Sequence, residues 1–314
     1  MQDVRKSVRQ VSEAVKRIDI HIHAVGDASD GCYIAKSLLR KMWFKLIANR
    51  LDINSLSEYV PKLVQYLRGS PIDTGVILAL DAIYDDKGNR DPKTAFYVPN
   101  GFIFKINAQY PELLPGISVH PSRQDALEEI DRCIDAGAVL VKWIPNAQGI
   151  DPSHKKYTAF YRKLVEYKLP LLSHAGYEFT LPTINQDLGN PVKLRIPLEE
   201  GVIVIASHSG ISYSGFSTKY TKVWLSLIKD YPNLYGDIAA SSIGIAGHYV
   251  KKLLKDEQVC QKLVNGSDFP IPPMKTVSDF FRKSNPFTRD FDIKRRSGVP
   301  ESVFHRGYTL LRNF

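Results

Sequence analysis

The chain has 314 residues, of which 44% are hydrophobic and 24% are charged. These fractions are typical of globular proteins and exclude a disordered tail, a collagen-like fibre and a simple coiled coil. Lys and Arg number 42 against 33 Asp and Glu, which gives a net charge of +9. This charge favours anionic partners, among them an acidic substrate. Because no zinc-finger, RRM or KH signature accompanies the basic residues, we expect no nucleic-acid partner.

The sequence also predicts the compartment. Its wholly apolar stretches, such as residues 202–206, are far shorter than the roughly 18 residues of a membrane span, so we expect no transmembrane segment. The charged residues 1–17 lack the apolar core of a secretory signal. The cysteines are widely spaced and form no CxxC pair, which is typical of a reducing compartment. We therefore expect a cytoplasmic protein, and whether it forms homo-oligomers is left open.

Short apolar segments recur along the chain and alternate with segments of helical periodicity. The predicted strands are residues 17–23, 75–80, 114–119, 138–142, 169–173, 201–206, 234–238 and 263–266. The predicted helices are residues 123–137, 154–167, 218–230 and 303–312. Near-continuous apolar strands are typical of a parallel sheet that is buried on both faces. Eight of them alternating with helices predict a (β/α)8 TIM barrel, formed as one domain by residues 1–314.

Residues 24–74 are too long for a simple barrel connection. The apolar row within them has a spacing of four and is widened by two aromatic residues; it comprises Ile34, Leu38, Met42, Trp43, Phe44 and Leu46. The basic residues Lys36, Arg40 and Lys41 accompany it, so we predict an amphipathic helix over residues 33–47. We expect this insertion to pack at the barrel rim as a lid; the alternative is a helix that binds a membrane surface or a partner. Residues 82–100 predict a loop over one end of the barrel.

The segment Asp19–Ile20–His21–Ile22–His23 is the strongest chemical signal in the sequence. Side chains alternate along a strand, so His21 and His23 face the same side. Two imidazoles on one face provide half of a metal site, whereas the alternative of two core histidines would bury an unpaired polar pair.

Further polar residues stand at the predicted ends of later strands. They are Lys142, His174, His208 and Asp268. The first three follow one another at intervals of about one β/α unit, and the interval from His208 to Asp268 corresponds to about two units. In a barrel these side chains converge on the carboxyl-terminal mouth, where active sites lie. His120 ends the third predicted strand and Arg195 precedes the sixth. Both are candidates for substrate binding, with a loop role and a surface salt bridge as the respective alternatives.

These motifs resemble the amidohydrolase superfamily, and within it the amidohydrolase-2 group of metal-dependent TIM-barrel hydrolases. The resemblance covers nearly the whole chain and rests on DIHIH (19–23), SVHP (118–121), VKWIP (141–145), LLSHAG (171–176), IASHSG (205–210), DIAAS (237–241) and NGSDFPIPP (265–273). The set is specific to the superfamily but says little about the substrate.

The resemblance implies that His21, His23 and Asp268 bind a divalent metal. In single-metal relatives the residue at His174 joins them and the one at His208 remains for acid–base work. In two-metal relatives both of these histidines bind the second ion, and a carboxylated lysine at the position of Lys142 bridges the pair. Zinc is the first expectation, with manganese, iron or cobalt as alternatives.

The expected function is that of a metal-dependent hydrolase that activates water against a C–N or C–O bond of a small carbonyl substrate. A metal lowers the pKa of its water to about 7. Asp268 then accepts the proton, while His208 helps to polarise the carbonyl. One alternative implied by the resemblance is non-oxidative decarboxylation with one metal. An alternative of another class is a non-catalytic barrel that binds an acidic surface through residues 33–47.

Overall fold

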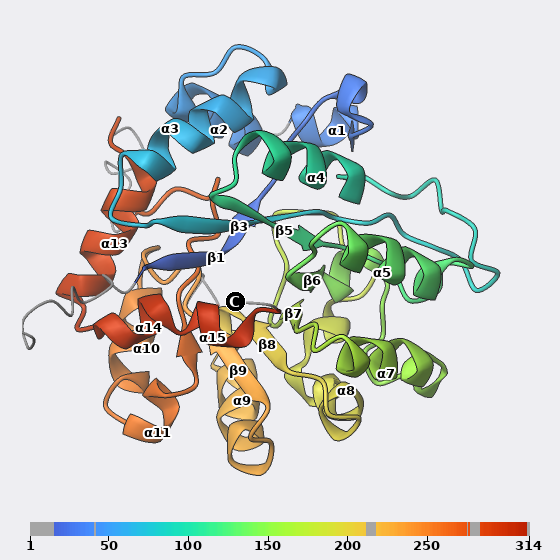
Figure 1. Ribbon diagram of the computed structural model, residues 1–314. Helices are drawn as coiled ribbons and strands as arrows, with labels where there is room; N and C mark the ends of the chain where they lie inside the picture. Colours follow the sequence, from blue (N-terminus) through green and yellow to red (C-terminus); the bar gives the residue numbers. More distant parts are fainter. Residues whose placement is uncertain (1–15, 41, 212–217, 275, 277–282, 313–314) are drawn as a thin grey trace, which may run out of the picture.

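A computed structural model describes residues 16–40, 42–211, 218–274, 276 and 283–312. Eight parallel strands form one sheet in sequence order, and helices surround it (Figure 1), which confirms the predicted TIM barrel. The strands are β1 (Ile18–His23), β3 (Thr74–Leu78), β5 (Leu113–Ile117), β6 (Leu140–Trp143), β7 (Leu171–His174), β8 (Val204–Ser207), β9 (Leu234–Asp237) and β10 (Leu263–Val264). Each predicted strand overlaps one of them.

The barrel closes between its first and last strands. Beyond the two residues of β10 the chain is irregular, yet it follows β1 through backbone hydrogen bonds. The amide of Ile20 donates to the carbonyl of Asn265 at 3.1 Å, that of Asp268 to His21 at 2.9 Å, and that of His23 to Phe269 at 2.8 Å. The first and last segments of the barrel are therefore fixed side by side.

A β-bulge interrupts β1. Asp19 pairs with Gly75 and Ile22 with Ile77, so β1 has one residue more than β3 between these pairs. The extra residue lets Ile20 join the apolar cluster of the barrel strands while His21 faces the polar site described below. Bulges of this kind bend a strand and re-aim side chains next to active sites.

Eleven of the described helices follow the barrel connections. They are α4 (Asn100–Gln109), α5 (Ala126–Asp135), α6 (Pro145–Gln148), α7 (Thr158–Glu166), α8 (Arg195–Glu199), α9 (Lys219–Asp230), α10 (Ala246–Leu253), α11 (Glu257–Cys260), α13 (Pro286–Arg296), α14 (Glu301–His305) and α15 (Gly307–Leu310). The four predicted helices fall on α5, on α7 with the 3-10 turn before it, on α9, and on α14 and α15. One feature of these predictions is wrong: the last helix is divided into α14 and α15.

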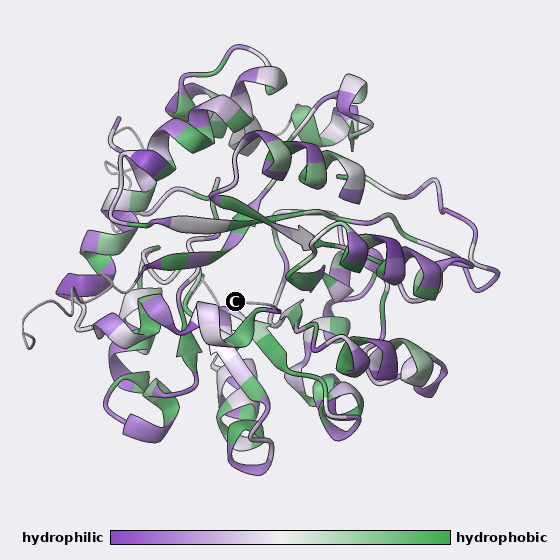
Figure 2. Cartoon of the chain, viewed as in Figure 1, coloured by the Kyte–Doolittle hydropathy of each residue, from purple (hydrophilic) through white to green (hydrophobic). Residues whose placement is uncertain are grey.

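The hydrophobic core has two parts. The larger cluster lies between the strands and the surrounding helices, and the smaller one gathers strand residues such as Val76, Leu140 and Ile205. Leu310 and Leu311 belong to the smaller cluster. Helix α15, which contains Leu310, therefore lies across the end of the barrel where this cluster is found (Figure 1). Figure 2 shows hydrophobic residues along the strands and hydrophilic residues on the outer faces of the helices. Within the described ranges, none of the helices has both the length and the hydrophobicity needed to cross a membrane.

The single helix predicted over residues 33–47 is wrong. The structure divides the segment into β2 (Tyr33–Ile34), α1 (Lys36–Leu39) and α2 (Met42–Leu51), and α3 (Tyr59–Arg68) follows. The physical reason is a distant partner: β2 pairs antiparallel with β4 (Phe96–Tyr97), which lies within the predicted loop 82–100. A strand pairing of this kind satisfies backbone groups that the helix would otherwise bond internally.

The amphipathic pattern of this segment is partly visible. Leu38 is fully buried, while Lys36 and Arg40 are exposed, as predicted. Ile34 is half-buried. The other members of the pattern lie outside the described part of the chain, in whole or in their side chains; they are Lys41, Met42, Trp43, Phe44 and Leu46.

Two neighbouring leucines of α1 provide a matched test of this packing. Leu38 has no exposed surface, whereas Leu39 is 39% exposed. We expect Leu38→Ala to lower the free energy of unfolding by about 2–5 kcal/mol, because a buried leucine leaves a cavity. Leu39→Ala is the control and is expected to cost well under about 1 kcal/mol. Urea denaturation measures both, and equal losses would contradict the buried position of Leu38.

Candidate metal centre

Three side chains at the carboxyl end of the barrel bring their ligand atoms together. His21 and His23 come from β1, and Asp268 comes from the segment after β10. Nε2 of His21 lies 3.2 Å from Nε2 of His23 and 3.3 Å from Oδ1 of Asp268, and the last two atoms are 3.2 Å apart. In a tetrahedral site with metal bonds of about 2.0–2.2 Å, neighbouring ligand atoms are roughly 3.3–3.6 Å apart. These residues therefore fit a divalent metal ion.

The ionisation states of these ligands also suit a cation. Burial alone would raise the pKa of Asp268, but the imidazoles of His21, His23 and His208 outweigh it and hold this pKa well below its usual range. Burial, together with the ammonium of Lys142, keeps the pKa of His21 well below its usual range. At neutral pH the site thus offers a carboxylate and a neutral imidazole, the forms that bind metals.

Asp237, at the end of β9, fixes the tautomer of His21. Nδ1 of His21 lies 2.9 Å from Oδ2 of Asp237, and both side chains are fully buried. Because a carboxylate only accepts hydrogen bonds, Nδ1 carries the proton and the lone pair of His21 is on Nε2, inside the ligand triangle. The other oxygen, Oδ1, accepts the backbone amides of His208 at 2.6 Å and of Ala239 at 3.0 Å. One carboxylate therefore orients residues from three strand ends.

Two residues of the candidate metal centre, His208 and Asp268, adopt left-handed backbone conformations. The φ angle is +61° at His208 and +67° at Asp268. Such angles cost about 1–3 kcal/mol in a residue with a side chain and persist only where the surroundings hold them. The amides of both residues are held by hydrogen bonds, to Asp237 and to the carbonyl of His21 respectively.

His174 and His208 lie on the same side of the barrel mouth. Their ring centroids are 5.0 Å apart, and that of His208 is 5.3 Å from that of His21. Nδ1 of His208 donates to the carbonyl of Ala239 at 3.3 Å, so the lone pair of this ring is on Nε2. Burial lowers the pKa of both histidines, that of His174 to about 4. Nε2 of His174 is buried and has no hydrogen-bond partner among the described residues.

Lys142, at the end of the predicted fourth strand, is fully buried beside this group. Its ammonium donates to Nε2 of His21 and to Oγ of Ser207, each at 3.0 Å. Burial lowers the pKa of Lys142 to about 8. The lysine thus lies where the sequence places it, within reach of the metal ligands.

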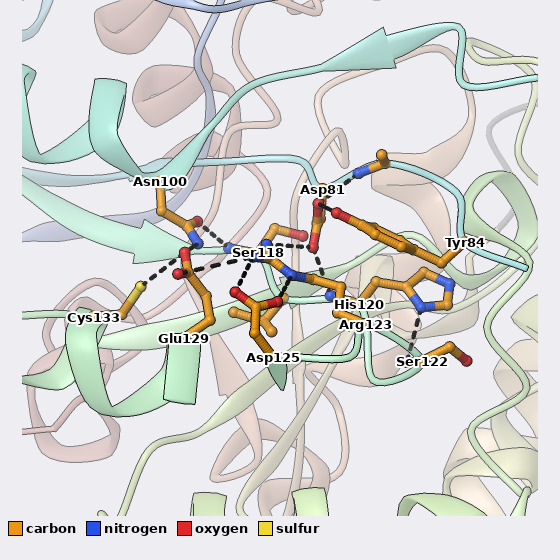
Figure 3. Close-up of polar contacts among 12 residues, drawn as sticks. Asp81, Tyr84, Asn100, Ser118, His120, Ser122, Arg123, Asp125, Glu129 and Cys133 are labelled. Atoms are coloured by element: carbon orange, nitrogen blue, oxygen red, sulfur yellow. Dashed lines mark hydrogen bonds and ion pairs between the residues drawn. The ribbon is translucent and has the colours of Figure 1, made fainter. Parts of the chain in front are cut away.

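The other two predicted site residues lie elsewhere. His120 is buried in a separate polar network with Asp81 and Arg123 (Figure 3). Its Nδ1 accepts the amide of Ser122 at 3.1 Å and its Nε2 donates to the carbonyl of Gln148 at 3.1 Å, so both ring nitrogens are engaged. Arg195 begins α8 and is exposed. Neither residue lines the pocket described next, and their assignment to substrate binding stays a prediction from the sequence.

A cavity of about 760 Å³, including the open space at its mouth, lies over the ligand triangle. Its floor contains His23, Lys142, His174, His208 and Asp268. Such a volume is in the range of small-molecule sites. The wall is mainly apolar, and residues from the insertion (Ile47) and from β4 (Phe96) take part in it.

Two residues of the site escaped the sequence analysis. Asp237 belongs to the DIAAS motif and ends a predicted strand, which is the same signal that identified His174 and Asp268. Glu178 lies in the pocket four residues beyond His174, with its Oε2 3.8 Å from Nδ1 of that histidine. The sequence carries no strand-end signal at Glu178, because it lies in an irregular segment after β7.

The family comparison agrees with this geometry. The family model described as amidohydrolase matches residues 18–285, which is most of the chain. This chain belongs to the amidohydrolase family. The chain is therefore a member of an enzyme family. Its residues His21, His23 and Asp268 form a candidate site for a divalent metal. No curated protein matches the sequence of this amidohydrolase.

Solved structures with low sequence identity share the barrel. An uncharacterised TIM-barrel protein from Bordetella bronchiseptica is 15% identical, with a TM-score of 0.61, over 90% of this chain and 99% of that one. A putative 2-pyrone-4,6-dicarboxylic acid hydrolase from Pseudomonas putida is 13% identical, with a TM-score of 0.60 and coverages of 94% and 97%. The 5-carboxyvanillate decarboxylase from Sphingomonas paucimobilis is 11% identical, with a TM-score of 0.54 and coverages of 93% and 96%. At these identities the similarity establishes the fold alone.

The role of Asp237 can be tested through metal affinity. In Asp237→Asn the amide nitrogen can donate to Nδ1 of His21, which would move the imidazole proton to Nε2 and remove a ligand lone pair. We expect the dissociation constant for zinc, measured by competition with a chelator, to rise about 10–100-fold. Asp81→Asn is the matched control, because Asp81 is a buried carboxylate outside the pocket. Wild-type affinity in the first variant, or an equal loss in both, would rule out this role.

Proposed function

We propose that this amidohydrolase is a metal-dependent hydrolase that cleaves a C–O or C–N bond of a small carbonyl compound with water. The observation that supports it best is the triangle of Nε2 of His21, Nε2 of His23 and Oδ1 of Asp268, at the spacing of a tetrahedral metal site and at the floor of a pocket. Such a site leaves a position open beyond its protein ligands, which is typical of catalytic rather than structural metals.

We propose His174 as an additional ligand from outside the close group of three, which would make the site five-coordinate with one position open to water. Its Nε2 is buried, and a buried nitrogen without a hydrogen-bond partner among the described residues is costly unless something else binds it. A divalent ion supplies a water of lowered pKa and a Lewis acid for the carbonyl oxygen. Zinc is the first choice, since the set of imidazole and carboxylate ligands suits it, and manganese, iron and cobalt are the alternatives.

The chain's own residues then manage the protons. Asp268 presents a carboxylate at the floor of the pocket, where it accepts the proton of the attacking water and delivers it to the leaving group. His208 is neutral near pH 7 because burial lowers its pKa, and its Nε2 can take up or return a proton. Asp237 binds the amide of His208 and the ring of His21, so acid–base chemistry and metal binding share one positioning group.

The number of metal ions depends on His208 and Lys142. With one ion, His208 stays available for acid–base work and the ammonium of Lys142 remains a hydrogen-bond donor to Ser207. With two ions, both His174 and His208 are ligands and Lys142 is a carboxylated bridge. We favour one ion, because Lys142, whose pKa burial lowers to about 8, is mainly an ammonium at neutral pH and donates to Oγ of Ser207 at 3.0 Å, whereas a carboxylated bridge needs the neutral amine.

The reaction class can be tested with purified protein of verified metal content. Neutral lactones, esters and amides are offered in parallel with unsaturated and aromatic carboxylic acids. We expect acid release from members of the first set, lost on metal removal and restored by zinc, and no CO2 from the second. Metal-dependent CO2 release without acid release would make the enzyme a decarboxylase. A protein that contains no metal by elemental analysis would favour the non-catalytic alternative.

His208→Asn separates the one-ion and two-ion arrangements. In a one-ion site we expect the bound metal to stay at one equivalent and kcat to fall about 10²–10⁴-fold, because acid–base help is lost. In a two-ion site the metal content would fall by half instead. His154→Asn is the control, since His154 lies outside the pocket and caps a 3-10 turn. Unchanged turnover with unchanged metal would remove His208 from the mechanism.

A further inference from the structure

The pocket of this amidohydrolase combines a polar floor with an apolar wall. The floor holds the metal ligands and the acid–base residues. The wall consists largely of aliphatic and aromatic side chains from five connections of the barrel, among them Val25, Ile47, Leu80, Phe96, Ile144 and Leu181. Val25, Ile47, Leu80 and Ile144 are buried, so the wall is packed against the body of the protein rather than loosely exposed. A ligand above the floor would therefore contact mainly carbon.

The charges along the pocket disfavour an anionic substrate tail. Lys142 is the one basic side chain other than histidine among the described residues that line it; it lies at the floor, and its ammonium donates to Oγ of Ser207 at 3.0 Å. No arginine lines the pocket in the described ranges. Glu178 adds a carboxylate to the wall, held by the backbone amides of Thr180 and Leu181. A carboxylate on the substrate, remote from the reacting carbonyl, would meet this charge without a guanidinium to receive it.

The rim of the pocket is apolar as well. Phe179 lines the cavity and is 65% exposed, and its ring stacks on that of Tyr177 with centroids 6.1 Å apart and an angle of 28°. Phe179 therefore extends the apolar wall to the solvent-exposed edge of the pocket. The net charge of +9 therefore resides mainly outside this pocket and does not define its ligand.

We infer that the substrate is a neutral carbonyl compound that carries an alkyl or aryl group, such as an alkyl-substituted lactone or a fatty or aromatic ester, rather than a dicarboxylate. The carbonyl would lie over the floor and the apolar group along the wall toward Phe179. The identity of the reacting bond rests on the proposed function, but the preference for a neutral apolar group rests on the pocket wall alone.

A binding experiment tests this preference without turnover. Hydroxamates bind to catalytic metals, and three of them differ only in the tail: acetohydroxamic acid, octanohydroxamic acid and suberic acid monohydroxamate, which has the length of the second and a terminal carboxylate. Their dissociation constants are measured by calorimetry on the zinc-loaded protein. Each methylene that leaves water favours binding about fourfold, so two buried methylenes suffice for a tenfold effect. We expect the octano compound to bind at least tenfold more tightly than either of the others.

A variant pair ties the effect to the wall. Phe179→Ser removes the phenyl group at the rim and is expected to reduce the ratio of acetohydroxamate to octanohydroxamate dissociation constants at least threefold. Ile245→Ser is the matched control, because Ile245 is a 52% exposed apolar residue outside the pocket, and its ratio should equal that of the unaltered protein. Both sites are exposed, so loss of folding is not expected.

The outcomes separate the two proposals. Equal affinities for all three compounds, tighter binding of the carboxylated one, or no binding by protein of verified zinc content would overturn the inference. A tenfold preference for the octano compound supports it even if every lactone, ester and amide of the substrate panel resists hydrolysis, a result that would count against the proposed function alone. Hydrolysis confined to carboxylated substrates would sustain the hydrolase and refute the neutral substrate.

Discussion

Closure of the barrel between its two ends is the constraint on which the site depends. The irregular segment after β10 follows β1 through three backbone hydrogen bonds, from Ile20 to Asn265, from Asp268 to His21 and from His23 to Phe269. These bonds bring together candidate metal ligands from β1 and from the segment that follows β10. Neither segment alone provides more than part of a metal site, so a protein that failed to close would have no centre. The bulge in β1 serves the same end, because it keeps Ile20 in the apolar cluster while His21 reaches the mouth.

Asp237 is the second residue on which the site depends. It is not itself a candidate metal ligand but forms hydrogen bonds to the groups that are. Its two oxygens have different tasks: Oδ2 fixes the tautomer of His21, and Oδ1 holds the backbone at His208 and Ala239. The left-handed backbone at His208 requires such an anchor, since the strained conformation would otherwise relax. Hydrogen bonds to a buried carboxylate are stronger than those between neutral groups, which explains how one side chain can support both.

The sequence predicts the barrel because strands buried on both faces are continuously apolar, and it predicts the strand-end residues because their spacing follows the β/α unit. His21, His23 and Asp268 meet as expected. The strand-end position of Asp237 is readable from the sequence too, but its hydrogen bonds to Nδ1 of His21 and to the amide of His208 are not, because they depend on how these side chains and backbone groups are oriented in the folded barrel. The same limit explains β2, whose residues Tyr33 and Ile34 follow a helical pattern but pair with Phe96–Tyr97. Helix α13 is a different case: Asn285 before Pro286 is an N-cap signal in the sequence, and it marks the start of a helix that the hydrophobic pattern alone does not predict.

In the proposed mechanism, chemistry and specificity come from different parts of this amidohydrolase family member. The strand ends hold the candidate ligands and proposed proton carriers in positions fixed by the barrel, while connections such as the insertion after β1 and the segment around Phe179 form the wall of the pocket. An apolar wall also affects the floor: by displacing water it lowers the local dielectric constant, so the attraction between Asp268 and its cationic or polar neighbours grows. A neutral apolar ligand would complete that exclusion of water, whereas a charged one would bring its hydration shell with it. If the proposed substrate class is correct, the wall thereby links the choice of substrate to the electrostatics of the reaction.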